Sequence, residues 1–192
     1  MPRVFVITGP SGAGKGTIER ALLARMPHEL ELAVSATTRP CRRGELHGRE
    51  YYFLSDAEFD RRIAAGDFLE YVEYVSGQRY GTLRSELARI AAAGRAALLD
   101  LEIEGALVVR DSVPRAVTVF VDAPLEELER RLRARATESA GEIGERIALA
   151  AEQKRHAAEF DHLVVNDDLA RATDDIAAMV ARELAAAGTM HA

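Results

Sequence analysis

A glycine-rich segment near the N-terminus has the residues needed to bind phosphate. The segment 9–17 reads GPSGAGKGT, follows the apolar, strand-like run 3–8 and precedes the segment 16–26, whose apolar residues have helical spacing. Glycines let backbone N–H groups surround an anion, and a helix N-terminus adds its dipole. We therefore expect this loop to bind a nucleotide through Gly9, Ser11, Gly12, Ala13, Gly14, Lys15, Gly16 and Thr17.

The distribution of lysine points to the same loop. Lys15 and Lys154 are the only lysines among 25 basic residues. A compact, mobile ammonium group can reach the outer phosphates of a nucleotide, which predicts a catalytic role for Lys15. Lys154 falls on a predicted helix, and we expect it to be a surface charge.

The residue after Lys15 departs from the strict phosphate-loop pattern, which has Ser or Thr there. Gly16 has no side chain that could contact Mg²⁺, and the nearest hydroxyl group is that of Thr17. We therefore assign no protein metal ligand and expect Mg²⁺ to be held mainly by nucleotide oxygens and water.

The composition argues against several other classes of protein. The chain has 192 residues, a formal net charge of −6, one cysteine and five histidines. A disulfide framework needs paired cysteines, the histidines lack the spacing of zinc ligands, and acidic charge disfavours nucleic-acid binding by the whole surface. No apolar run approaches the roughly 20 residues of a membrane span. No signal peptide is recognised, which predicts a cytoplasmic protein without membrane or nucleic-acid partners.

Strand-like and helical segments alternate along most of the chain, which predicts an α/β fold with a parallel sheet covered by helices on both faces. The segment 36–83 breaks this alternation and is expected to form a mostly antiparallel insertion. The predicted strands are 3–8, 32–38, 51–54, 68–75, 79–81, 96–100, 117–122 and 163–165. The predicted helices are 16–26, 56–65, 82–93 with Thr82 as its cap, one from Pro124, one ending near Phe160, and a last one from 167–168 to about 186.

Several motifs occur in an order that closely resembles the guanylate kinase family of P-loop nucleoside monophosphate kinases. They are GPSGAGK from Gly9, SATTRPCRRGELHGREYYF from Ser35, FLEY from Phe68, YGT from Tyr80 and VVNDDL from Val164. The resemblance extends along nearly the whole chain. It implies an enzyme that transfers the γ-phosphate of ATP to GMP, and to dGMP, in purine nucleotide metabolism, with Mg²⁺ as the cofactor.

The same resemblance implies three regions and a set of GMP-binding residues. The regions are a P-loop core (1–35, 84–125 and 150–192), a GMP-binding region (36–83) and a lid (126–149). For the GMP phosphate, the resemblance implies Arg39, Arg42, Tyr51 and Tyr80. For the guanine base it implies Ser35, Glu70 and Thr82. Glu45 and Glu102 would support the substrate site, and Asp100 would be the acid near the phosphates.

The chemistry of these side chains agrees with those roles. Arginine offers a rigid fork of donors to phosphate oxygens. A carboxylate such as that of Glu70 can accept from both guanine N1–H and the exocyclic amine, a donor pair that adenine lacks. The remaining aromatic residues of this region are expected to lie in the core, and two arginines on the solvated loop. These residues are Tyr52, Phe53, Tyr71 and Tyr74, and Arg43 and Arg49.

Residues 130–138 resemble the lid segment of the family. The resemblance implies that lid arginines stabilise the charge on the transferred phosphate, whereas Arg130 and Arg133 face solvent. The lid arginines are Arg131, Arg135 and Arg146. Ala134 and Ala136 stand where the family usually has glycine, which predicts a stiffer lid. Restoring both glycines is then expected to change the kcat of the enzyme.

The segment after the strand 96–100 also departs from the usual sequence of the family. Glu102 stands where the family usually has Asp, and Glu104 where it has Gln. These changes are expected to shift GMP affinity rather than the reaction.

Two alternatives compete with GMP phosphorylation. One is a related kinase that acts on a sugar phosphate, and the other is a non-catalytic binding module of the guanylate-kinase-like type. The tyrosine pair Tyr51 and Tyr80, with Glu70 and Thr82, argues against the first. Lys15 together with the lid arginines argues against the second. Nothing in the sequence indicates an oligomeric state.

Overall fold

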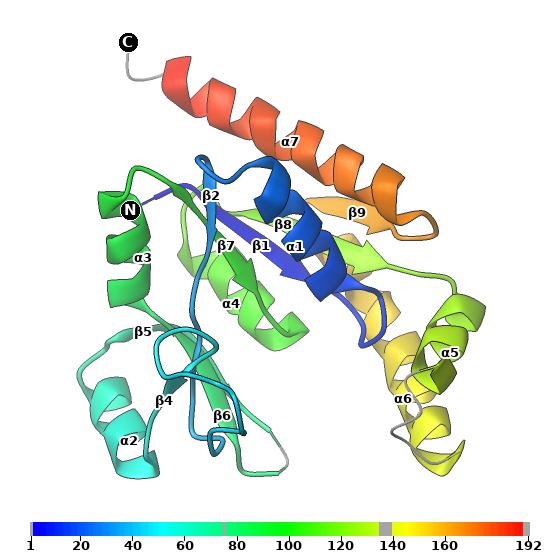
Figure 1. Ribbon diagram of the computed structural model, residues 1–192, viewed down its shortest axis with the longest axis horizontal. Helices are drawn as coiled ribbons and strands as arrows, with labels where there is room; N and C mark the ends of the chain where they lie inside the picture. Colours follow the sequence, from blue (N-terminus) through cyan, green and yellow to red (C-terminus); the bar gives the residue numbers. More distant parts are fainter. Residues whose placement is uncertain (1, 75, 135–139, 190–192) are drawn as a thin grey trace.

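Five parallel strands form the central sheet of the protein. The structure is a computed structural model that describes residues 2–74, 76–134 and 140–189 (Figure 1). The strand order is β2-β7-β1-β8-β9, and every neighbouring pair is parallel. The strands are β1 (Val4–Thr8), β2 (Leu30–Leu32), β7 (Ala96–Asp100), β8 (Val117–Asp122) and β9 (His162–Val165). Parallel strands require crossover connections, so the α/β fold expected from the alternation is confirmed.

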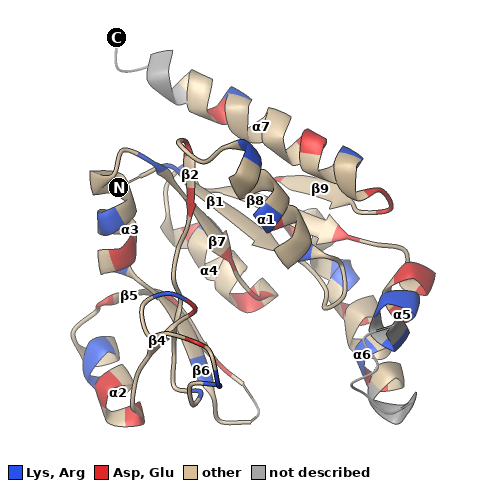
Figure 2. Ribbon diagram, viewed as in Figure 1, with Lys and Arg blue, Asp and Glu red and all other residues tan. Residues whose placement is uncertain are grey.

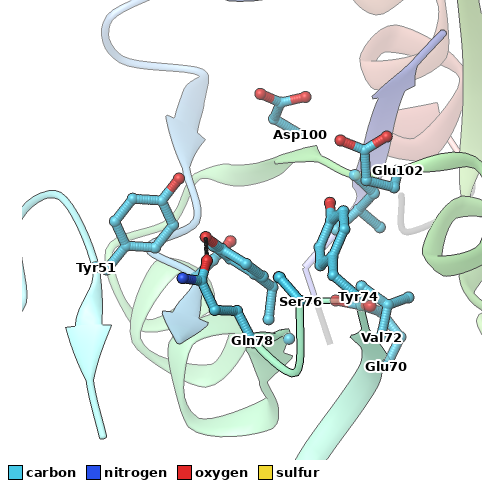
Figure 3. A pocket seen from close by; sticks show the side chains of 12 residues that line it. Tyr51, Glu70, Val72, Tyr74, Ser76, Gln78, Asp100 and Glu102 are labelled. Carbon is cyan, nitrogen blue, oxygen red and sulfur yellow. Dashed lines mark hydrogen bonds between the residues drawn. The ribbon is translucent and has the colours of Figure 1, made fainter. Parts of the chain in front are cut away.

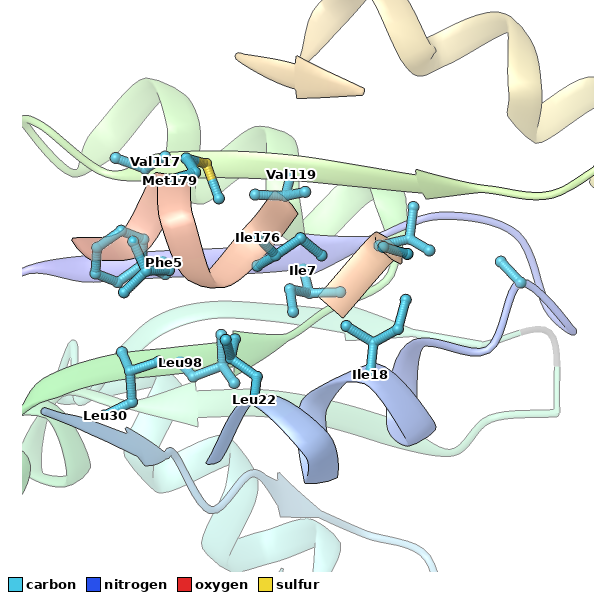
Figure 4. Packing of buried hydrophobic residues seen from close by; sticks show 14 of the residues in the cluster. Phe5, Ile7, Ile18, Leu22, Leu30, Leu98, Val117, Val119, Ile176 and Met179 are labelled. Atoms are coloured by element: carbon cyan, nitrogen blue, oxygen red, sulfur yellow. The ribbon is translucent and has the colours of Figure 1, made fainter. Parts of the chain in front are cut away.

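Strand β1 is buried on both faces of this sheet. Because successive side chains of a strand point to opposite faces, Phe5 and Ile7 pack into one hydrophobic cluster, whereas Val4 and Val6 pack into another. Figure 4 shows the first cluster, which α1 (Lys15–Arg25) and α7 (Leu169–Thr189) cover. The second cluster is covered by α3 (Arg84–Ala92) and α4 (Ile103–Ser112).

A smaller sheet lies below the central sheet in Figure 1, beside α2 (Asp56–Ala64). Its strands are β3 (Ala36–Thr37), β4 (Tyr52–Phe53), β5 (Phe68–Glu73) and β6 (Arg79–Leu83), in the order β4-β3-β6-β5. The β3–β4 pair is parallel and the other two pairs are antiparallel, as expected for the insertion. Phe59 of α2 stacks on Phe68 with ring centroids 4.4 Å apart, which gives this sheet its own small core.

Two helices extend from the other end of the central sheet. They are α5 (Leu125–Ala134) and α6 (Ala140–Gln153), and the short 3₁₀ helix η1 (Lys154–Glu159) follows them. Figure 1 places them opposite the smaller sheet. Figure 2 shows that charged residues are concentrated on peripheral helices such as α5, with few on the strands of the central sheet. No helix in the described ranges is both long and apolar enough to cross a membrane.

Some expected elements differ from the structure. The single strand expected at 32–38 is two strands, because Leu32 pairs with β7 of the central sheet and Ala36 pairs with β6 of the smaller one. Thr82 is not a helix cap. It lies inside β6 opposite Glu70, and α3 begins two residues later. Helix α4 was not anticipated from the sequence.

Lys154 is not the surface charge expected from the sequence. Its Nζ lies 3.0 Å from Asp122 Oδ2 and donates to the carbonyl of Ala123 at 2.9 Å. The side chain is 26% exposed, so this ion pair is partly shielded from water. Lys154 therefore ties η1 to the carboxyl end of β8.

Candidate nucleotide-binding site

The glycine-rich segment forms a tight loop between β1 and α1. Gly14, at the N-terminus of α1, has a φ of 91°, which places it in the left-handed region that favours glycine. Gly9 has a φ of 132°, and a Cβ there would lie 2.1 Å from the carbonyl oxygen of Val121. Only glycine fits at Gly9, and the loop therefore presents backbone N–H groups at the start of a helix, the arrangement that binds phosphate.

Lys15 folds back over this loop. Its Nζ donates to the carbonyl oxygen of Gly9 at 2.7 Å. The lysine also interacts electrostatically with Asp100, which ends β7 next to β1. The ammonium group therefore lies at the mouth of the loop, in reach of an anion bound there.

Two side chains from distant segments donate hydrogen bonds to the backbone of the loop. Asn166 Nδ2 donates to the carbonyl oxygen of Ala13 at 2.7 Å, and Arg131 Nη1 donates to the same oxygen at 3.2 Å. Arg131 also donates to the backbone carbonyl of Asn166 at 3.0 Å. The structure thus brings the expected lid residue Arg131 to the phosphate loop. Asn166 belongs to the motif VVNDDL, but the sequence does not indicate this contact with the loop.

Of the other expected lid residues, Arg146 lies on α6 and Arg135 lies outside the described residues, as does Ala136. Arg130 and Arg133 are 72% and 60% exposed, so the expectation that they face solvent is confirmed. Each pairs with a glutamate on its own helix.

A cavity of about 410 Å³ opens between the smaller sheet and the end of β7 (Figure 3). Six of the expected GMP-binding residues line it: Ser35, Tyr51, Glu70, Tyr80, Asp100 and Glu102. The sequence did not indicate the other side chains in its wall, which are Val72, Tyr74, Ser76, Gln78 and Leu101. Asp100 is the link between this cavity and the phosphate loop, since it lines the former and interacts with Lys15.

Glu70 provides a buried acceptor in the cavity wall. The residue is 4% exposed, and Oε1 has no hydrogen-bond partner among the described side chains and backbone. Burial raises the pKa of the Glu70 carboxyl, and the neighbouring Thr82 opposes this rise. The hydroxyl of Thr82 is buried beside this carboxylate. Buried polar atoms are normally satisfied, so the open Glu70 Oε1 indicates a ligand with a donor group.

Gly105 leaves the space that the Glu70 carboxylate occupies. A Cβ at this position of α4 would lie 2.7 Å from Glu70 Oε2, and the flexible carboxylate would have to move. Gly105→Ala is therefore expected to raise KM for the nucleotide bound in this cavity several-fold, with little change in kcat. Steady-state constants equal to those of the wild type would contradict this role of Gly105.

Arg39 contacts an aromatic residue of the cavity wall, Tyr51, and an acidic residue, Glu45. It is 7% exposed, its Nη2 lies 2.8 Å from Glu45 Oε1, and its guanidinium carbon lies 5.2 Å from the centroid of the Tyr51 ring. Glu45 also accepts from the backbone N–H of Arg42 at 2.7 Å, and these two partners lower the pKa of the Glu45 carboxyl. The side chain of Arg42 is exposed. Arg39, Glu45 and Tyr51 are thus assembled, whereas Arg42 is held only through its backbone.

Tyr71 and Tyr74 are not core residues, contrary to expectation. They are 46% and 40% exposed, and Tyr74 lines the cavity. Figure 3 shows the hydroxyl of Tyr74 directed toward Glu102. Burial and the negative charge of Glu102 raise the pKa of Tyr74. The contact links the smaller sheet to the segment that follows β7.

Comparison with known proteins identifies relatives over almost the whole chain. The family model described as guanylate kinase matches residues 1–183. Guanylate kinase of Symbiobacterium thermophilum is 49% identical over 183 residues, which cover 95% of this chain and 86% of that protein. Guanylate kinase of Rubrobacter xylanophilus is 47% identical over 184 residues, 95% of each chain. The crystal structure of guanylate kinase from Anaplasma phagocytophilum has a TM-score of 0.73 at 29% identity and covers 95% of this chain and 86% of that one.

The parallel sheet, the phosphate loop between β1 and α1 and the inserted sheet define a kinase of the P-loop class. The chain belongs to the guanylate kinase family, the enzymes that transfer the γ-phosphate of ATP to GMP. The comparisons favour neither the sugar-phosphate kinase nor the non-catalytic module that the sequence had left as alternatives.

Proposed function

We propose that this chain phosphorylates GMP, and dGMP, with ATP as the phosphate donor, and that the cavity beside β7 holds the nucleoside monophosphate. The observation that carries this proposal is the buried, unpaired carboxylate oxygen of Glu70 in a cavity that reaches Asp100 at the phosphate loop. Guanine presents two adjacent donors, N1–H and its amine, to such an acceptor. Thr82 and Ser35 would complete the contacts to the base.

On the donor side, the loop N–H groups and Lys15 would hold the ATP phosphates. Arg131, already bonded to the loop carbonyl of Ala13, would lie next to the transferred group, with Arg135 and Arg146 as further lid cations. Arginines in these positions stabilise charge on the equatorial oxygens of the transferred phosphoryl group in the transition state. The remaining ATP contacts are assigned to Gly9, Ser11, Gly12, Ala13, Gly14, Gly16 and Thr17.

On the acceptor side, Arg39, Arg42, Tyr51 and Tyr80 would hold the GMP phosphate. Its oxygen is already anionic, so it attacks the γ-phosphate directly, without a protein general base or a covalent intermediate. Glu45 would fix the guanidinium of Arg39, as it does in the structure at 2.8 Å.

Mg²⁺ fits this site as the partner of ATP. The carboxylate of Asp100 stands beside Lys15 and supplies the hard oxygen donor that Mg²⁺ prefers. When bound, the metal ion would neutralise charge on the phosphates. Within the described ranges, no group of three or more His, Cys, Asp or Glu side chains forms a metal site.

The three regions expected from the sequence suit a reaction that must exclude water. In this proposal, residues 36–83 carry GMP, residues 126–149 form the lid, and the segments 1–35, 84–125 and 150–192 form the core between them. Closure would keep water from taking the γ-phosphate. Because both substrates are cellular nucleotides, we place the activity in the cytoplasm.

An ADP-release assay with a panel of acceptors tests the proposal. The enzyme is expected to turn over rapidly with GMP, measurably with dGMP, and at background level with AMP or a sugar phosphate. Equal turnover with AMP would contradict the role of Glu70, and turnover with the sugar phosphate alone would replace the proposed acceptor.

The raised pKa of Glu70 predicts an acid limit to the use of GMP. The carboxylate accepts the guanine donors only when ionised, and burial moves its pKa above the ordinary value of 4.5. As pH falls through the raised pKa, the group becomes protonated, so kcat/KM for GMP is expected to decrease at a higher pH than an ordinary glutamate would allow. The Glu70→Gln variant lacks this titrating carboxyl, whereas GMP itself titrates in the same way with both enzymes. The difference between the pH profiles of the wild type and the variant therefore measures the contribution of Glu70. Parallel profiles would contradict the prediction.

A further inference from the structure

Glu19 is a buried carboxylate that the proposed reaction does not yet use. It lies in the second turn of α1, is 5% exposed, and its Oε1 has no hydrogen-bond partner among the described residues. Glutamate is rarely buried unless it is paired, because desolvation penalises the charged form. Burial and the negative charge of Asp100 raise the pKa of Glu19, and Lys15 and Arg20 oppose this. The fold thus keeps a buried acidic group beside the phosphate loop.

The position of Glu19 relates it to the missing hydroxyl group. Glu19 follows Gly16 by three residues, so the two share one face of the helix. A Cβ at residue 16 would lie 3.6 Å from Arg20 Nη1 and 3.9 Å from Glu19 Oε2. In the strict loop pattern, the Ser or Thr hydroxyl that contacts Mg²⁺ extends from that Cβ. The carboxylate of Glu19 therefore stands next to the place from which this ligand is absent.

The other hydroxyl group at the start of α1 is engaged elsewhere. Thr17 is exposed, and its Oγ1 accepts from Arg20 Nη2 at 3.2 Å. It lies on a different side of the helix from the buried Glu19, so it does not occupy the place that Gly16 leaves.

We infer that Glu19, together with Asp100, forms a carboxylate site for the hydrated Mg²⁺ of MgATP and substitutes for the hydroxyl group that Gly16 lacks. The inference rests on the proposed function, which brings ATP to this loop. Lys15 and Arg20 offset the charge of these two carboxylates, so the site would attract a divalent cation through its oxygen donors rather than through a net negative charge. One or two carboxylates plus phosphate oxygens and water is the donor set that Mg²⁺ uses in nucleotide enzymes.

Titration of Mn²⁺ into the complex with a non-hydrolysable ATP analogue, followed by electron paramagnetic resonance, tests this site directly. Glu19→Gln is expected to raise the dissociation constant of Mn²⁺ about tenfold, the range found when a residue supporting a metal is lost. The affinity of the Glu19→Gln variant for the ATP analogue without metal is measured in the presence of a chelator. It should stay within about twofold of the wild-type value, because a residue that supports the metal acts only when the metal is bound. Glu152→Gln, an equal charge change on the exposed face of α6, is the control. Unchanged Mn²⁺ affinity, or an equal loss of metal-free binding, overturns the inference.

Two further variants separate a metal-binding role from a structural one. Gly16→Ser in the Glu19→Gln background restores the hydroxyl group and is expected to recover Mn²⁺ affinity. Glu19→Leu removes the buried carboxyl, and we expect it to raise Tm while weakening Mn²⁺ binding, because an unpaired buried polar group is destabilising. A lower Tm with normal Mn²⁺ affinity would assign Glu19 a packing role instead. Failure of the wild type to bind the analogue would instead contradict the proposed function itself.

Discussion

Replacing Lys15 with alanine is expected to lower kcat by about 10²–10³-fold, the loss found when one preorganised charge-stabilising donor is removed. The ammonium group at the mouth of the loop would contact the ATP phosphates most strongly as charge develops during transfer. The GMP cavity is built from other side chains, so the affinity for GMP should change little. Steady-state kinetics with saturating ATP, together with a GMP titration, measures both quantities.

The second lysine offers a matched control for this experiment. Lys154→Ala removes the partly buried pair with Asp122 and the hydrogen bond to Ala123. It is expected to lower Tm and leave kcat close to the wild-type value. If Lys15→Ala kept near-normal turnover, or if Lys154→Ala lost as much turnover as Lys15→Ala, Lys15 would not have the role assigned to it.

Replacing Glu70 with glutamine is expected to raise KM for GMP by about 10–100-fold, because hydrogen bonds to a charged group contribute about 1.5–3 kcal/mol. The amide keeps one acceptor but places an N–H₂ group against a guanine donor. The preference for GMP over AMP should shrink, since the site loses the acceptor pair that distinguishes the two bases. The kcat at saturating GMP should change far less, because Glu70 does not contact the phosphates in the proposed complex.

Glu73→Gln is the control for this substitution. Glu73 lies three residues later in the same strand and is exposed, so the variant makes the same chemical change outside the cavity. Its KM values for GMP and AMP should match those of the wild type. A Glu70→Gln enzyme that kept full discrimination against AMP would show that other groups recognise the base.

The local features of the phosphate loop were predictable from the sequence. Strand β1, the loop and α1 are contiguous, and the positive φ angles at Gly9 and Gly14 occur where only glycine is favoured. The cluster of Arg39 and Glu45 also comes from one short segment. The resemblance to the family implies that both residues belong to the GMP site, and in the structure they form an ion pair. Arg42, which the resemblance also implies, does not line the cavity.

The errors share a physical origin, which is pairing between residues far apart in the chain. Threonine is a common residue type at helix N-caps. The backbone of Thr82, however, pairs with β5 across the hairpin. Lys154 lies on a polar helix face, yet the end of β8 comes within 3.0 Å of it. Tyr74 belongs to an aromatic segment that resembles a core strand, but the hairpin directs it into the cavity. Local pattern carries no information on such partners.

The sequence by itself determined the phosphate loop, the α/β alternation and the likeness to guanylate kinases, because each depends on a pattern of consecutive residues. Only the tertiary structure decided which charged groups stand together. It placed Asn166 and Arg131 on one loop carbonyl, and it buried Glu19 beside the position that Gly16 leaves open. Burial and proximity depend on how helices and strands pack, and they decide whether a carboxylate is a solvated charge or an unpaired acceptor poised for a ligand.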